Sequence, residues 1–308
     1  MSSLIEQAAQ RLEQLRQAGV DVPAVAAAAP PAVAVPAVAA PAAPAVTSRR
    51  VDVDVGLLAA NGIVTPDAPR TTTADQFRVV KRPLIANATG KGSSTINHAN
   101  LIMVTSALPG EGKTFTALNL AMSIAAELDH TVMLVDADVA RPSILRMLGV
   151  PEGPGLLDLL DGSVQMHEVL LRTNVDKLTV LPSGKPHSRA TEMLASEAMS
   201  LLLDDMARRY PDRIIVFDSP PLLLTTEARV LATHMGQIVV VVQAGRTKQS
   251  DVQAALHTIE SCPLRMMLLN QVRTDEASYG YGYGYGYGYG HGYGHGKGAP
   301  PAQPSPAT

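Results

Sequence analysis

The stretch Leu101-Ile-Met-Val-Thr-Ser-Ala-Leu-Pro-Gly-Glu-Gly-Lys113-Thr114 decides the fold of this 308-residue chain. Its apolar beginning predicts a short buried strand over 101–105, and the residues after it follow the pattern G-x-x-x-x-G-K-[ST], with Ala107 in place of the first glycine. Glycines let such a loop wrap closely around phosphate groups, and the N–H groups of the next helix point at the anion. The stretch therefore predicts a phosphate-binding loop between a strand and a helix.

The residues after this loop continue a β-α-β pattern. A helix is expected over 113–128, with its buried stripe at Ala117, Leu120, Ala121, Ile124 and Leu128, and a strand over 131–135 follows. Further apolar strands are expected at 178–181, 214–217, 237–243 and 266–269, with helices near 191–209 and 248–260. This alternation predicts an α/β P-loop NTPase fold, a mostly parallel sheet with helices on both faces.

Carboxylates follow two of the expected strands. Asp136 and Asp138 come after 131–135, and Asp218 comes after 214–217. Open α/β sheets bind ligands at the carboxyl ends of their strands, and Mg²⁺ prefers hard oxygen ligands. We therefore expect a magnesium site there, with a carboxylate left over to accept a proton from an attacking hydroxyl. A single aspartate at a strand end more often only caps a helix or a turn.

Lys113 is expected to reach the β- and γ-phosphates of ATP, and the Thr114 hydroxyl to bind Mg²⁺. Asn270, at the end of the last strand, either hydrogen-bonds the adenine edge or only makes a turn. The expected nucleotide contacts are Pro109, Gly110, Glu111, Gly112, Lys113, Thr114, Phe115 and Asn270.

The C-terminal segment 275–308 is expected to be a flexible tail. Seven of the eight tyrosines lie in it, alternating with glycine from Tyr279 to Tyr289 and followed by Tyr293. The alternation is also typical of a strand or of stacking repeats, but glycine at every second position makes ordering costly in entropy. His291 and His295 continue the pattern, as spacers or as metal ligands. An ATP site together with a row of phenol hydroxyls favours a kinase that is its own substrate. The expected phosphoacceptors are Tyr279, Tyr281, Tyr283, Tyr285, Tyr287, Tyr289 and Tyr293.

The other end of the chain predicts two more segments before a kinase domain at 72–274. Leu4, Ala8, Leu12 and Leu15 share one face of a helix over 1–20, which docks either on a partner or on its own domain. An Ala/Pro-rich linker is expected over 21–71. Its uncharged part, 22–46, resembles a membrane span, but its prolines each cost roughly 3 kcal/mol in a helix interior and favour an extended, disordered linker.

Composition narrows the class of protein. The net charge of −3 gives no drive toward nucleic acid or an anionic membrane. Cys262 is the single cysteine, which excludes an intramolecular disulfide, fits a reducing cytoplasm and predicts a packed thiol. Charges at Glu6, Arg11 and Glu13 interrupt any signal-peptide-like apolar run.

The three motifs Ala107–Thr114, Val132–Pro142 and Ile214–Pro221 resemble the Walker A, Walker A′ and Walker B boxes of bacterial tyrosine kinases, most closely the exosortase-associated autokinases of exopolysaccharide clusters. The resemblance implies Mg-ATP-dependent phosphorylation of the tail tyrosines and regulation of polysaccharide synthesis or export. It implies Mg²⁺ ligation by Asp138 and Asp218, and proton acceptance by Asp136. Lys113, Asp136, Asp138 and Asp218 are thus the expected catalytic residues. Ala140 stands where the family commonly has a basic residue.

Asp75, Arg78 and Lys81 are similar to the family's E-x-x-R-x-x-R self-association helix. At spacings of three they share a helix face, where they either pair across a subunit boundary or form an ordinary solvated surface.

Within the same fold, the partitioning and cell-division-site ATPases are the alternative. Their loop carries an extra lysine where this chain has Leu108. The kinase resemblance implies a homo-oligomer, a transmembrane co-polymerase activator and a protein-tyrosine phosphatase as partners, and no nucleic acid. It implies a cytoplasmic location, peripheral to the inner membrane through the partner.

Overall fold

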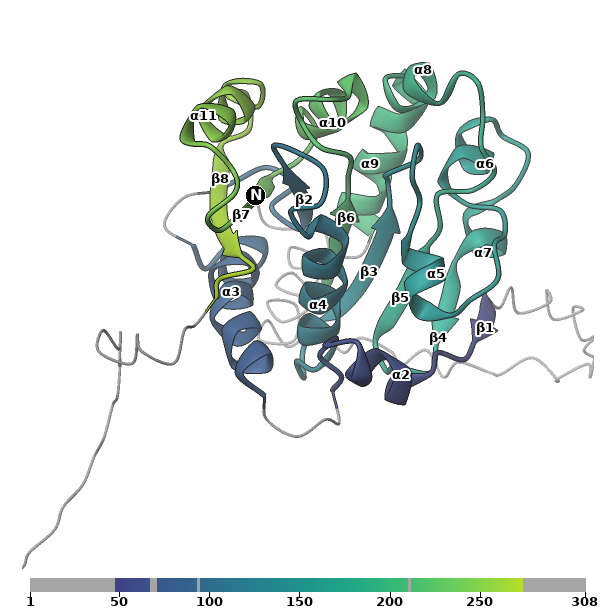
Figure 1. Cartoon of the computed structure of the whole chain (residues 1–308). Helices are drawn as coiled ribbons and strands as arrows, with labels where there is room; N and C mark the ends of the chain where they lie inside the picture. The colour runs from purple at the N-terminus through teal and green to yellow at the C-terminus, as the bar shows by residue number, and fades with distance from the viewer. Residues whose placement is uncertain (1–47, 67–70, 93–94, 210–211, 274–308) are drawn as a thin grey trace, which may run out of the picture. The chain divides into compact units, whose positions relative to one another are not determined.

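The computed structural model describes residues 48–66, 71–92, 95–209 and 212–273 (Figure 1). Its strands form one sheet in the order β1-β4-β5-β3-β6-β2-β7-β8. All neighbouring strands are parallel except the pair β4 and β5. The strands are β1 (Arg49–Val51), β2 (Leu101–Ser106), β3 (Thr131–Asp136), β4 (Leu171–Thr173), β5 (Leu178–Leu181), β6 (Arg213–Asp218), β7 (Gln237–Gln243) and β8 (Leu264–Asn270).

Helices cover both faces of this sheet, because successive residues of its central strands point to opposite sides. In β2, Ile102 and Val104 belong to one core and Leu101 and Met103 to the other. The first core contains α2 (Val55–Ala60), α3 (Thr72–Ala88), α4 (Lys113–Ala125) and α5 (Ile144–Leu148). The second contains α6 (Leu156–Leu160), α7 (Met166–Val169), α8 (Ala190–Leu194), α9 (Glu197–Arg209), α10 (Thr226–Ala232) and α11 (Gln249–His257). The predicted P-loop NTPase architecture is confirmed.

Element boundaries agree with the sequence patterns except at the end of α4, which stops at Ala125 and leaves Leu128, expected in its buried stripe, 87% exposed. β5 and β7 have the predicted limits, and β8 begins two residues earlier than predicted. The helix expected over 191–209 is two helices, α8 and α9, because the Ser196 hydroxyl accepts a hydrogen bond from the Met199 amide and starts a new helix. Cys262 is buried as predicted, and its thiol donates to the carbonyl groups of Met235 and Leu264.

Residues 48–66, which the sequence patterns group with the linker, belong to the folded domain. β1 pairs with β4 at one end of the sheet, and Val53, Leu58 and Ile63 are buried in the first core. The Asn174 side chain fixes the segment, because its amide bonds both the N–H and the carbonyl of Val53. The signal is weak in the sequence because each of these elements is short.

The expected N-terminal helix over 1–20, the linker up to residue 47 and the tyrosine-rich tail over 275–308 lie outside the described residues. Within the described part of the chain, no helix combines the length and the apolar character needed to cross a bilayer.

Candidate active site

The phosphate-binding loop joins β2 to α4 at the carboxyl end of the sheet. Gly110 and Gly112 have φ angles of 82° and 95°, which a residue with a Cβ adopts only with strain. A Cβ on Gly112 would also collide with the side-chain amide of Asn270. Lys113 is the first residue of α4, so the helix N–H groups open onto the loop.

Glu111 holds this loop from inside. Its side chain is buried, and its carboxylate accepts hydrogen bonds from the Leu108 amide at 2.6 Å and from the Thr247 hydroxyl. The Gln243 amide lies 3.5 Å from the same carboxylate. Glu111 was expected as a nucleotide contact, and the structure instead turns its carboxylate toward the segment after β7.

The end of β8 is tied to the same loop. The Asn270 side-chain amide donates to the Glu111 carbonyl at 2.9 Å, and the Gln271 side-chain amide donates to the Gly110 carbonyl at 3.1 Å. The sequence allowed Asn270 either to contact adenine or to make a turn. The structure adds a third role, because the Asn270 side chain holds the phosphate loop in place.

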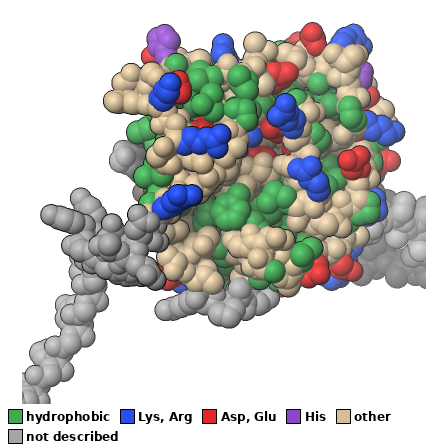
Figure 2. Space-filling view, in the orientation of Figure 1, with side chains coloured by type: hydrophobic (Ala, Val, Ile, Leu, Met, Phe, Trp, Pro, Cys, Tyr) green, Lys and Arg blue, Asp and Glu red, His purple; other side chains and the backbone are tan. Residues whose placement is uncertain are grey.

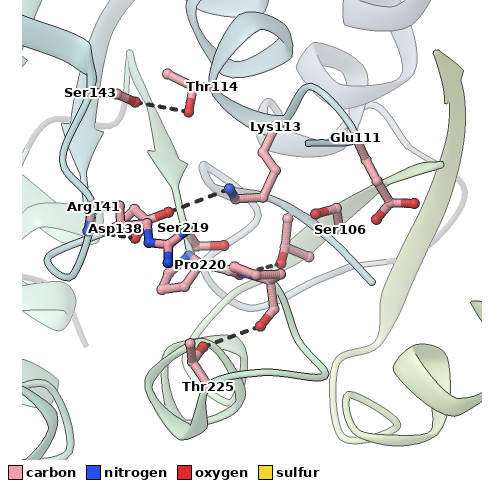
Figure 3. A network of polar contacts seen from close by, with 12 residues as sticks. Ser106, Glu111, Lys113, Thr114, Asp138, Arg141, Ser143, Ser219, Pro220 and Thr225 are labelled. Carbon is pink, nitrogen blue, oxygen red and sulfur yellow. Dashed lines mark hydrogen bonds and ion pairs between the residues drawn. The ribbon is translucent and has the colours of Figure 1, made fainter. Parts of the chain in front are cut away.

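The acidic strand ends meet where β3 and β6 are neighbours. Asp136 and Asp218 are opposite each other in the register of these strands. Lys113 crosses from the loop toward Asp138, and its Nζ lies 3.4 Å from the Asp138 carboxylate (Figure 3). Both side chains are largely buried, at 12% and 8% exposed. The structure therefore brings together the lysine and the three aspartates that the sequence singled out.

Asp136 is held by the start of α5. Its Oδ2 accepts hydrogen bonds from the Ser143 and Ile144 amides, each at 3.0 Å, whereas its buried Oδ1 has no hydrogen-bond partner. Burial raises the pKa of Asp136 to about 6, although these backbone N–H groups lower it. The carboxylate lines a cavity of about 360 Å³, whose walls include Pro142 and Pro182.

Asp218 is the most deeply buried carboxylate of the site. Its pKa is raised to about 7, chiefly by burial and also by the neighbouring Asp136 and Asp138. The Thr114 hydroxyl and Lys113 lower this pKa, but neither oxygen of Asp218 has a partner within hydrogen-bond geometry. Buried, unpartnered carboxylate oxygens fit the binding of a hard cation such as Mg²⁺, which would supply their missing charge.

Several residues that contact this site carry no motif. Ser143 donates from its hydroxyl to Thr114 Oγ1 at 3.2 Å, and Thr247 and Gln271 bond the loop (Figure 3 shows the first pair). Such residues are hard to find by sequence, because a hydroxyl or amide after a strand is common. The only sequence feature that points to these residues is their position, because each comes after a strand or motif that ends at this edge of the sheet. Figure 2 shows Lys and Arg side chains spread over the upper part of the face in view, with apolar and acidic side chains between them.

The proposed self-association residues are placed differently from one another. Asp75 and Arg78 are exposed and form an ion pair at 2.6 Å. Lys81 instead turns inward, where its Nζ donates to the Ser123 carbonyl and lies 2.7 Å from the Glu127 carboxylate. The three charges do not share one exposed face.

Comparisons with known proteins agree on one family. A family model described as an AAA domain matches residues 99–271. The tyrosine-protein kinase Ptk of Acinetobacter johnsonii is 31% identical over 182 residues, which are 58% of this chain and 24% of Ptk. The tyrosine-protein kinase CpsD of Streptococcus agalactiae is 30% identical over 184 residues, which are 58% of this chain and 79% of CpsD.

A solved structure supports the same grouping. The VpsO kinase domain superposes with a TM-score of 0.53 and 28% identity, covering 66% of this chain and 100% of that domain. This chain therefore spans about a quarter of Ptk, most of CpsD and all of the VpsO kinase domain. With a matched phosphate loop, three acidic strand ends and these relatives, the chain belongs to the AAA-domain family of bacterial tyrosine-protein kinases.

Proposed function

We propose that this chain is an ATP-dependent tyrosine autokinase whose substrate is its own C-terminal tyrosine cluster. The supporting observation is the bracing of Asn270 and Gln271 against the phosphate loop, at 2.9 and 3.1 Å. The segment that carries the tyrosines therefore starts beside the phosphate loop. The 21 residues from Val272 to Tyr293 span roughly 25 Å as a glycine-rich coil, enough to reach a neighbouring site or the chain's own.

Lys113 and the loop N–H groups would hold the β- and γ-phosphates of ATP. Thr114, Asp138 and Asp218 would bind Mg²⁺, which when bound neutralises charge on the phosphate oxygens. Lys113 lies 3.4 Å from Asp138, so the lysine of the phosphate loop is in direct contact with the acidic edge. Positioning and electrostatics, and no covalent enzyme intermediate, would carry the rate.

Asp136 would accept the proton of the tyrosine hydroxyl. Its Oδ2 accepts two amide hydrogen bonds and its buried Oδ1 has no partner, so a tyrosine hydroxyl that reached Oδ1 would meet an acceptor with no competing donor among the described residues. The cavity of about 360 Å³ beside it has proline walls, against which a phenol ring packs well.

The test is phosphosite mapping of purified protein incubated with Mg-ATP. Wild type should carry phosphate on tail tyrosines, and both Lys113→Met and a chain ending at Ser278 should carry none. Lys91→Met is the matched control, because Lys91 is exposed after the end of α3. ATP turnover without tyrosine label, even with a membrane activator present, would contradict the proposal.

We further propose a role in polysaccharide regulation, because the sequence resembles the autokinases of exopolysaccharide clusters. A transmembrane co-polymerase would activate the kinase at the inner membrane, and a phosphatase would reverse it. Each phosphate adds about −1.5 to −2 charges, so several on alternate tail residues would repel one another and loosen a homo-oligomer. A phosphorylated protein that sediments as the same oligomer as the unmodified one would rule out this last step.

A further inference from the structure

An apolar groove of about 810 Å³ lies between α3 and β8, beside the phosphate loop. We call it the edge groove. Phe77, Val80 and Pro83 of α3 form one wall, and Met266 and Leu268 of β8 form the other. No described segment fills it, and its lining includes Val272, one residue before the described chain ends.

β8 is the last strand of the sheet, so its outer backbone edge has no neighbouring strand among the described residues. Its side chains alternate, with Met266 and Leu268 half-buried and Met267 and Leu269 exposed by 65% and 62%. An open edge flanked by apolar side chains is a template for another strand. Natural proteins usually protect such an edge with charge, proline or a covering segment.

We propose that the tyrosine–glycine tail, residues 279–289, docks in the edge groove as an additional strand antiparallel to β8. In an extended chain the tyrosines all point to one face and the glycines to the other. The tyrosines would face α3 and fill the groove. This docking is independent of the proposed kinase activity.

The connection has the right length and direction. Eight residues, 271–278, separate β8 from Tyr279, and hairpin connections need only about two to five. Gln271 has a φ of 57°, a left-handed conformation typical of a turn after a strand. Val272, two residues after the strand, still lines the groove, so the chain leaves β8 beside it.

The chemistry of the groove suits a phenol better than a purely apolar ring. Pro83 lacks an N–H, so the Val79 carbonyl one turn earlier has no i+4 helical partner, and both residues line the groove. A tyrosine presents an apolar ring to Phe77 and Val80 and a hydroxyl to such an acceptor. Glycine on the other face removes any side chain that would clash or add binding, which keeps the docked strand reversible.

One consequence rests on the proposed kinase function: docking would hide the acceptor hydroxyls from the catalytic edge, and phosphate on the tyrosines would reverse the docking. Each phosphotyrosine brings about −1.5 to −2 charges into an apolar groove, where their desolvation opposes binding. The docked tail is therefore the unmodified state, and a charged tail is the released one.

Hydrogen exchange tests the docking without nucleotide. Amides on the outer edge of β8 should exchange roughly tenfold more slowly in the full chain than in a chain ending at Ser278. Changing all seven tail tyrosines to glutamate should abolish the difference, with no need for kinase activity. Changing them to phenylalanine should keep most of it.

Two variants locate the binding surface. Val79→Asp puts charge on a groove residue that is 74% exposed, so the fold tolerates it, and it should remove the protection of β8. Leu201→Asp is the matched control, an exposed apolar residue on α9 away from the groove, and it should change nothing.

Equal exchange of β8 in the full and shortened chains overturns the proposal. Protection that grows with protein concentration also overturns it, because a second copy would then be the occupant. Protection lost on removing residues 1–47 but kept without the tail assigns the groove to the N-terminal segment and likewise overturns it.

Discussion

The ammonium group of Lys81 lies 2.7 Å from the carboxylate of Glu127, and only 5% of the Lys81 side chain is exposed. This pair joins α3 to the turn that follows α4, the helix that begins at the phosphate loop. The buried ammonium of Lys81 also donates to the Ser123 carbonyl, so its hydrogen bond and its ion pair are both made inside this chain. The D-x-x-R-x-x-K pattern therefore does not form a single self-association surface, because its last residue, Lys81, anchors α3 to the rest of the domain.

Removing one partner of this pair should destabilise the domain. Glu127→Gln leaves the buried ammonium without its counter-charge, and we expect a loss of about 1–3 kcal/mol in the free energy of unfolding. Urea denaturation measures it. Arg82→Gln is the control, because Arg82 contacts the same carboxylate at 3.5 Å from an exposed position and should cost under about 0.5 kcal/mol. Equal losses in the free energy of unfolding for Glu127→Gln and Arg82→Gln would contradict the assignment of Lys81 and Glu127 as a buried structural pair.

The same pair predicts a pH dependence of stability. Burial alone would raise the pKa of Glu127, but Lys81, Arg82 and His130 together hold it below its usual 4.5. A carboxylate with a lowered pKa in the folded state stabilises the protein above its ordinary pKa. Its contribution should therefore be present above pH 4.5 and be lost as the pH falls through the lowered value. The denaturation midpoints of wild type and Glu127→Gln should converge in that acid range.

The phosphate loop should fail when its geometry is disturbed at Gly112. Gly112→Ala combines a φ of 95° with a collision against the Asn270 amide, so we expect ATP affinity to fall by more than about a hundredfold. Gly110→Ala shares the positive φ of 82° but meets open space, and its loss should be clearly smaller. Calorimetric titration of ATP separates the two. If both variants bind alike, the Asn270 brace does not position the loop.

Glu111 should act through the loop and not through the nucleotide. Glu111→Gln keeps the size of the side chain but replaces one acceptor oxygen with a donor, opposite the Leu108 amide or the Thr247 hydroxyl. We expect KM for ATP to rise roughly tenfold while the fold is retained. Thr247→Val should give a smaller rise in the same direction. A change in kcat alone, with KM for ATP unchanged, would argue for a direct catalytic role.

Much of this site could be predicted because its parts are local. The loop from Ala107 to Thr114 and the aspartates after β3 and β6 are set by short patterns, and parallel pairing brings their strand ends together. The bracing of the loop by Glu111, Thr247 and Gln271 could not be predicted. It depends on contacts between residues more than 130 positions apart, which no spacing rule encodes. The exposed position predicted for Lys81 was wrong for a related reason. Periodicity indicates which residues share a face of a helix, but it does not indicate which residues of another element that face contacts.

The exposed half of the self-association motif gives the last prediction. Arg78 is paired with Asp75 on the surface of α3, and exposed pairs of this kind contribute about 0–1 kcal/mol to folding. Arg78→Glu should therefore leave the free energy of unfolding nearly unchanged while shifting the protein toward smaller species in sedimentation velocity. Arg208→Glu is the matched control, an exposed arginine in the helical pair with Asp204 on α9, and it should leave the distribution as in wild type. If Arg78→Glu assembles as wild type does, Asp75 and Arg78 form an ordinary solvated pair, and any homo-oligomer uses another surface.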